Sequence, residues 1–233
     1  MPITGALVSL AAVRVAGIDA WGAFVGLLIV VQLLAQIVDW GSRDAVLRTV
    51  GTDPDGVQAR WQTNFVSRFL PLLPVCLVVL AIVVLAGMRL SAGTLLAAAV
   101  WLTALAVSRA FDAMIVLRRA FGLALAVEVL ATAVTVGGIV VLGASRSIEA
   151  LTALFAGTAV LRVLMFRVLG AFTGFRGQAR FDRGELQRTW PFFAMTMSGA
   201  IGSRVDLYVL AAVLPLAAGP YQVLTALLLL VQA

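Results

Sequence analysis

Arg204 and Asp206 are the only charged residues between Arg188 and the C-terminus, and they lie inside a long apolar stretch. A guanidinium can bind a phosphate through two parallel hydrogen bonds, and it stays ionised when water is removed. A carboxylate two positions away does not face it on a helix. Two interpretations therefore remain open. Both side chains line a polar cavity for an anionic substrate, with the acid tuning the cation, or each forms a structural pair with another helix.

Five further charged residues lie within apolar segments and are candidates for lining a cavity: Arg14, Arg109, Asp112, Glu128 and Arg162. Arg109 and Asp112 share a helix face, so an ion pair within the helix is the simplest account of them. Glu128 has no basic neighbour in sequence and needs an arginine from another helix, a proton or water. Arg162 lies about two turns from its helix end, deep enough to contact an anionic headgroup. For Arg14, snorkelling to the membrane rim is the favoured interpretation.

The residue types that carry most catalysis and metal binding are missing. The chain has no His, the usual imidazole base and the commonest metal ligand, and its one cysteine, Cys76, cannot form an internal disulfide. The sequence has no phosphate-binding loop and no nucleophile–base set. We therefore expect no enzyme activity, no metal and no cofactor. All 17 basic residues are Arg in a chain rich in Ala, Val and Leu, so the positive charge predicts no nucleic-acid binding.

The elements that must position these charges are membrane helices. Hydrophobic residues make up 62% of the 233-residue chain, against about 45–50% in ordinary globular proteins. The excess is spread along the chain, which predicts an all-α, multi-pass transmembrane bundle. We expect about eight apolar segments, with a short helix at 41–50 in the first polar connection: 3–17, 20–40, 65–87, 91–116, 121–143, 148–169, 190–216 and one that begins near 220.

Trp21 and Trp40 bracket the second of these segments. Their separation along a helix is close to the thickness of the hydrocarbon core, and tryptophan is enriched at both membrane surfaces. The spacing therefore predicts that the two indoles mark the membrane rims.

The distribution of arginine predicts the orientation in the membrane. With these segments, 13 arginines lie in or towards one set of connections and three in or towards the opposite set, and Arg204 is assigned to neither. Because positively charged connections stay on the cytoplasmic side, we expect the N-terminus and the long Arg-rich connections to be cytoplasmic. The membrane would be the plasma (inner) membrane of the cell.

A weak internal repeat predicts the domain organisation. At an offset of 200 residues, 7–33 aligns with 207–233 without gaps, and Leu10-Ala-Ala-Val13 recurs as Leu210-Ala-Ala-Val213. Repeats of this kind build many transporters, although shared Leu, Ala and Val leave chance as an alternative. The interpretation is a six-helix lobe at 1–171, a cytoplasmic connection at 172–189 and the first two helices of a truncated second lobe at 190–233.

Three stretches carry a resemblance to a known family. They are Val15-Ala-Gly-Ile-Asp-Ala-Trp-Gly22, Val38-Asp-Trp-Gly-Ser-Arg-Asp-Ala-Val-Leu-Arg48, and Ser198–Tyr221 with its Arg204-Val-Asp206 and Gly219-Pro-Tyr221. These stretches resemble the turn after the first helix, the end of the second helix and the seventh helix of polysaccharide and O-antigen flippases. That family belongs to the multidrug, oligosaccharidyl-lipid and polysaccharide exporter superfamily, and the resemblance covers its N-terminal part only.

The resemblance implies two lobes that rock around a central cavity. They would move oligosaccharide on a polyprenyl diphosphate from the cytoplasmic to the outer leaflet, for polysaccharide or O-antigen (lipopolysaccharide) biosynthesis. The expected partners are this lipid-linked substrate, membrane lipids, and H⁺ or Na⁺ at Glu128, Asp112 or Asp206. Two alternatives stay open. A multidrug extruder of the same fold predicts an acid-dominated cavity, and a non-transporting scaffold subunit predicts that all the intramembrane charges pair off.

Overall fold

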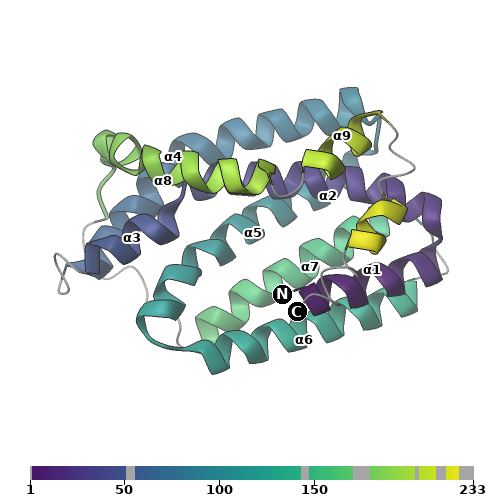
Figure 1. Cartoon of the computed structure of the whole chain (residues 1–233), viewed down its shortest axis with the longest axis horizontal. Coiled ribbons are helices and arrows are strands. Elements are labelled where there is room, and N and C mark those ends of the chain that lie inside the picture. Colours follow the sequence, from purple (N-terminus) through teal and green to yellow (C-terminus); the bar gives the residue numbers. More distant parts are fainter. Residues whose placement is uncertain are drawn as a thin grey trace.

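A computed structural model describes residues 2–50, 56–142, 147–169, 179–202, 205–213 and 219–225 (Figure 1). Within these ranges the chain forms helices and short connections, and no strand. The helices are α1 Pro2–Ala16, α2 Ile18–Asp39, α3 Ser42–Val50, α4 Val57–Ile82 with a π-helical turn at Val83–Gly87, α5 Ala92–Leu117, α6 Phe121–Leu142, α7 Ile148–Val168, α8 Arg183–Gly202 and α9 Val205–Val213, followed by a short helical segment at 219–225.

Five of these helical stretches are long and apolar enough to cross a membrane: Trp21–Arg48, Val57–Gly87, Ala92–Leu117, Phe121–Leu142 and Ile148–Val168. They correspond to the second to sixth of the expected segments. The chain is therefore an all-α protein with several membrane-type helices.

The remaining expected segments do not add to this number. α1 has 15 residues, short of the roughly 20 that span a bilayer. The seventh segment corresponds to α8 and α9, between which residues 203–204 lie outside the described part. Of the eighth, the structure describes 219–225. A total of about eight membrane helices thus stays a prediction.

The helices run along the long axis of the molecule, and their connections gather at two ends (Figure 1). One end, on the left of Figure 1 and here called the α3 end, holds α3, the α5–α6 turn and the start of α8. The α1–α2 and α4–α5 connections lie at the opposite end, as do the end of α6 and the start of α7. This alternation agrees with the grouping of connections on which the arginine count was based.

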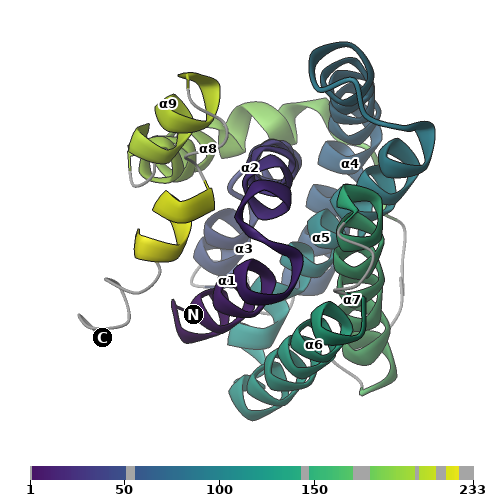
Figure 2. The same ribbon diagram turned by 90° about the vertical axis from the view of Figure 1, so that its right-hand side faces the viewer.

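Five helices close a ring in the order α1, α2, α5, α7 and α6, because each packs against the next and α6 returns to α1. Figure 2 shows this ring end-on, with α4 and α8 outside it on the α2 side. The aromatic rings of Phe24, Trp101 and Phe155 pack together inside it, with centroids 4.8–5.7 Å apart. Edge and offset contacts of this kind add to the apolar burial that holds the helices together.

α4 begins at Val57, eight residues before the expected start at Phe65. The added turns are polar in sequence but buried: Trp61 Nε1 donates to the carbonyl of Ala110 at 2.8 Å, and Asn64 Nδ2 donates to Glu185 Oε1 at 3.3 Å. Tertiary partners on α5 and α8 thus satisfy side chains that hydropathy assigns to a solvated connection.

α8 is joined to the first six helices by specific contacts at the α3 end. Trp40 Nε1 donates to the carbonyl of Leu186 at 3.1 Å, and the Trp40 ring stacks on Phe193 with a centroid distance of 4.0 Å. The carboxylate of Glu185, which is 3% exposed, pairs with Arg60 at 3.3 Å. Trp40 therefore anchors α8, and its position at a membrane rim stays a prediction.

Gly41 is the point at which α8 comes closest to the α2–α3 connection. Its φ is +66°, and a Cβ there would lie 2.6 Å from the backbone carbon of Phe192. Gly41→Ala is expected to lower the free energy of unfolding by about 1–3 kcal/mol, because it combines backbone strain with a clash against backbone atoms. The measurement is thermal unfolding in detergent, monitored by the reaction of the buried Cys76 thiol with a thiol-reactive dye.

Gly157→Ala is the matched control, because a Cβ on this helical glycine of α7 would meet no atom within 4 Å. An alanine inside a helix is expected to leave stability unchanged or to raise it by up to about 1 kcal/mol. Equal unfolding midpoints for the two variants would show that α8 does not depend on the close approach at Gly41.

Candidate functional site

A cavity of about 240 Å³ lies inside the five-helix ring. Hydroxyl, amide and charged groups from four helices and from 219–225 share its wall with aromatic rings. The lining residues are Gly5, Val8, Ser9, Trp21, Leu28, Gln32, Trp101, Leu105, Glu128, Thr132, Thr135, Phe155, Thr158, Ala159, Arg162 and Gln222. A polar cavity of this kind inside a bundle of apolar helices is the default candidate for a binding site.

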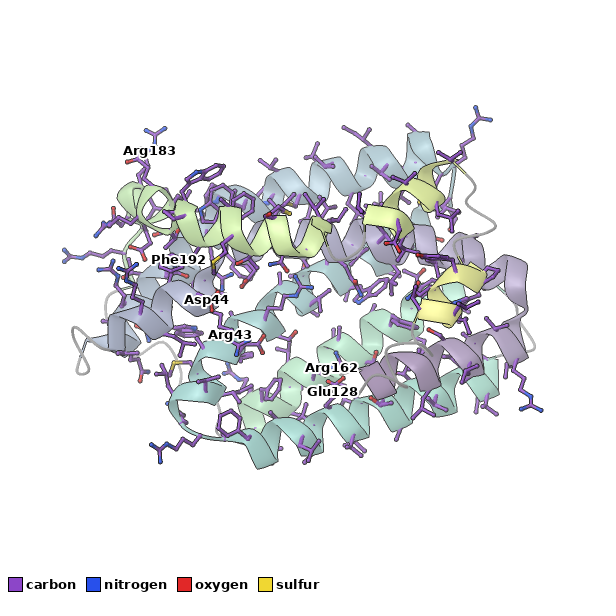
Figure 3. All side chains as sticks on the ribbon, in the orientation of Figure 1. Arg43, Asp44, Glu128, Arg162, Arg183 and Phe192 are labelled. Atoms are coloured by element: carbon purple, nitrogen blue, oxygen red, sulfur yellow. The ribbon has the colours of Figure 1, made fainter. Side chains whose placement is uncertain are left out.

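Glu128 of α6 and Arg162 of α7 meet in this cavity. Arg162 Nη2 donates to Glu128 Oε1 at 3.0 Å, and the two side chains are 30% and 29% exposed. Figure 3 shows the pair side by side, next to the first turns of α1. Glu128 lies seven residues into α6 and Arg162 six residues before the end of α7, so both are about 10 Å from the α3 end of their helices. The sequence indicated that Glu128 needed an arginine, and the structure supplies Arg162.

Three buried polar atoms of the lining have no hydrogen-bond partner: Trp21 Nε1, Arg162 Nε and Gln222 Oε1. Two of them are donors and one is an acceptor. Buried polar groups in folded proteins are nearly always paired, so each exception needs an explanation. All three residues line the cavity, but the three atoms themselves are covered by neighbouring protein atoms. Trp21 is 1% exposed, so it belongs to the cavity wall and not to a membrane rim.

A second polar layer lies one helical turn nearer the α3 end. Arg109 Nη1 of α5 donates to Gln36 Oε1 of α2 at 2.8 Å, and these residues are one turn beyond Leu105 and Gln32 of the lining. Among the described residues no direct ion pair joins Arg109 to Asp112, so the simple intrahelical pair expected for them is not what forms.

Asp112 connects this layer to the surface. Its side chain is exposed and lies within electrostatic range of Arg43, Arg109 and Glu128. Four of the predicted site residues, Arg109, Asp112, Glu128 and Arg162, therefore form one polar track from the α3 end into the cavity.

The other predicted site residues lie elsewhere. Arg14 is exposed in the last turn of α1, at the end opposite α3. Asp206 is exposed in the first turn of α9 and is not part of the lining; its carboxylate accepts a hydrogen bond from the hydroxyl of Tyr221. Arg204 lies outside the described residues.

The segment 219–225 closes the cavity at the end away from α3. A Cβ on Gly219 would lie 2.8 Å from Cα of Gly22, so this segment contacts the backbone of α2 directly. That contact brings Gln222 into the lining.

A buried ion pair outside the cavity caps the C-terminal end of α2. Arg68 of α4 is 1% exposed, and its Nη1 donates to the carbonyl oxygens of Val38 and Asp39 at 3.2 and 2.9 Å and to Asp39 Oδ1 at 2.9 Å. Carbonyls in the last turn of a helix lack partners within the helix. Arg68 therefore caps α2, whereas the sequence interpretation counted it only as a topology charge.

Several lining residues had no place in the sequence interpretation. Gln32, Gln222 and the three threonines Thr132, Thr135 and Thr158 are uncharged, and single polar residues in apolar helices are common. One signal was present in the sequence: Gln32 and Gln36 lie one turn apart on an otherwise apolar helix, which marks a polar stripe.

The described residues contain no cluster of three or more Cys, Asp or Glu side chains that could hold a metal ion. The lining offers hydrogen bonds, one ion pair and aromatic faces for binding.

No protein-family model matches this chain, and neither a search of curated proteins nor a search of solved structures finds a match. The flippase resemblance thus rests on the sequence stretches alone.

Proposed function

We propose that this chain is the N-terminal part of a membrane transporter that moves lipid-linked oligosaccharide from the cytoplasmic to the outer leaflet by alternating access. The α3 end would face the cytoplasm, where the sugar is attached to its polyprenyl diphosphate. The observation that carries the proposal is the polar cavity in the ring of α1, α2, α5, α7 and α6, with the Glu128–Arg162 pair inside it. A bundle that serves only as a scaffold gains nothing from maintaining such a cavity, because buried charge and empty polar volume both cost stability.

The distribution of charge supports a substrate with an anionic group and an uncharged part. Arg43 and Arg109 lie on the polar track at the α3 end, where a diphosphate would arrive and where guanidinium groups can bind it. Deeper in, Glu128 neutralises Arg162. The diphosphate would stay at the α3 end while the sugar enters the cavity and the polyprenyl chain remains in the bilayer.

Movement by rocking requires a second lobe that contacts the first at both ends of the cavity. α8 is held at the α3 end through Trp40 and Glu185, and 219–225 contacts α2 at Gly22 near the other end. A second lobe that starts with these segments would contact the first lobe at both ends of the cavity. Loosening one set of contacts while keeping the other would open the cavity to one side at a time.

A multidrug extruder is the second candidate, and one observation favours it. Glu128 shares the cavity with Trp21, Trp101 and Phe155. A cationic drug could replace Arg162 as the partner of Glu128 and stack on these rings.

The experiment compares two ligands on the purified chain in lipid nanodiscs. We expect a fluorescent polyprenyl-diphosphate sugar to bind and to be displaced by the unlabelled lipid, whereas polyprenol without the diphosphate sugar does not displace it. Arg162→Ala is expected to weaken binding about tenfold or more, because a hydrogen bond to a charged group contributes roughly 1.5–3 kcal/mol.

Arg167→Ala is the control, because Arg167 lies on the same helix with an exposed side chain and its removal should change affinity by less than about twofold. Passage of the lipid across vesicle membranes, followed by dithionite bleaching of the outer leaflet, then measures transport. Tighter binding of a cationic dye than of the lipid would favour the extruder. No saturable binding of either ligand would rule out both transport functions for this cavity.

A further inference from the structure

The lining of the cavity has no net charge and is rich in groups that both donate and accept hydrogen bonds. Glu128 and Arg162 neutralise each other. The amides of Gln32 and Gln222 and the hydroxyls of the lining threonines can each donate and accept. A ligand that also does both suits such a wall. Hydroxyl groups do both, whereas a carboxylate or a phosphate only accepts and an ammonium only donates.

The walls of the cavity are arranged for a ligand with one apolar face and a polar rim. Trp21, Trp101 and Phe155 contribute flat aromatic groups, and hydroxyl or amide side chains occupy the rest. The ring C–H groups of a sugar pack on aromatic faces while its hydroxyls bond to polar side chains. Sites for small molecules commonly combine apolar walls with a few placed polar groups.

The volume is sufficient for one sugar ring. About 240 Å³ is the share of roughly eight molecules of liquid water at ~30 Å³ each. The diphosphate and any further sugars would lie on the polar track towards the α3 end.

The internal ion pair disfavours charged sugars. A carboxylate on the ring would compete with Glu128 for Arg162, and an ammonium would compete with Arg162 for Glu128. Either ligand leaves one charge of the lining without its partner in a poorly hydrated site, which is costly.

We propose that this cavity is a binding subsite for one uncharged sugar ring. The inference rests on the proposed function in one respect, since the ring is taken to be part of the transported headgroup. The lobe that contains the cavity would then select the substrate by the neutrality of this sugar.

The test measures binding of radiolabelled glucose to the chain in nanodiscs, with unlabelled competitors. Galactose, mannose and N-acetylglucosamine are expected to compete at concentrations similar to glucose. Glucuronic acid and glucosamine are expected to need about tenfold higher concentrations or more, because each disturbs the ion pair. Equal competition by the charged sugars, or by the non-sugar polyols glycerol and inositol, would overturn the proposal.

Two lining variants and one matched control locate the site. Gln222→Leu and Thr158→Val remove hydrogen-bonding groups from the cavity at nearly constant volume, and each is expected to weaken glucose binding about fivefold or more. Thr103→Val makes the same change in a separate apolar groove between α4, α5 and α7, where the hydroxyl donates to the carbonyl of Ala99 at 2.8 Å, and should leave binding unchanged. Protection of the Cys76 thiol shows that each variant is folded. Equal losses in all three variants would overturn the assignment to the cavity.

The result also separates this inference from the proposed function. Saturable glucose binding that depends on Gln222, without binding or passage of the lipid-linked sugar, would keep the subsite and reject the flippase. Binding of the lipid-linked sugar that is indifferent to Gln222→Leu and Thr158→Val, with no binding of free sugars, would keep the flippase and reject the subsite.

Discussion

Arg68→Ala is expected to lower the free energy of unfolding by about 3–5 kcal/mol, the usual effect of removing one partner from a buried ion pair. The substitution leaves the Asp39 carboxylate and two helix-end carbonyls, those of Val38 and Asp39, without their shared donor. It also removes a guanidinium that lies 5.8 Å from the ring centroid of Phe65 and 5.2 Å from that of Phe69. The end of α2 and the middle of α4 would separate at this point.

The measurement is the unfolding midpoint in detergent, monitored by circular dichroism and by the labelling of Cys76. This thiol is buried between α4 and α2, with its Sγ 3.8 Å from the carbonyl oxygen of Leu34. Arg68→Lys keeps the charge but cannot reach all three oxygens, so an intermediate loss is expected. The exposed Arg167→Ala should cost less than about 1 kcal/mol. An Arg68→Ala midpoint that matches Arg167→Ala would show that Arg68 serves orientation in the membrane and not the fold.

The positions of the central helices follow from hydropathy and capping. Segments expected at 91–116, 121–143 and 148–169 correspond to α5, α6 and α7 with ends that agree within one or two residues. The starts of α5 and α7 are marked locally, since Ser91 Oγ accepts from the Thr94 amide and Ser147 Oγ accepts from the Ala150 amide, both at 3.1 Å. Information within one turn of the chain is sufficient for such boundaries.

Boundaries that depend on distant partners were not predictable in this way. α4 starts early because Trp61 and Asn64 find partners on α5 and α8, and nothing near them in sequence indicates this. The two tryptophans at the ends of the second segment have the spacing of rim residues, yet Trp21 faces the cavity and Trp40 stacks on Phe193. Both outcomes depend on how each helix is rotated about its axis, and a uniformly apolar helix carries little signal for its rotation.

The candidate site shows the same contrast between features that the local sequence indicates and features that depend on distant partners. Sequence alone identifies Glu128 and Arg162 as charges that need an explanation, because a charge within an apolar span is costly. It does not identify them as partners, since they are 34 residues apart and any of several arginines could have met Glu128. The uncharged part of the lining is harder still to predict, because Thr158 also satisfies its hydroxyl within its own helix, by donating to the carbonyl of Phe155 at 3.0 Å.

Exchange of the two charges of the cavity is expected to separate folding from function. Glu128→Ala and Arg162→Ala each leave one charge unpaired inside the bundle, so each should lower stability by about 1–3 kcal/mol, less than for a fully buried pair because both side chains are partly exposed. The double replacement Glu128→Arg with Arg162→Glu restores an ion pair of opposite polarity. Its unfolding midpoint should return most of the way to that of the original chain.

Binding of lipid-linked sugar should not return with it. Arg162 lines the cavity together with Trp21 and Gln222, and the exchange replaces this donor on α7 with a carboxylate that can only accept. We therefore expect affinity to stay at least about tenfold below that of the original chain even where stability is recovered. Recovery of both quantities together would mean that the two residues act only as a structural pair, as a scaffold protein requires. Recovery of stability alone would mean that this pair is maintained inside the membrane for its contact with a ligand.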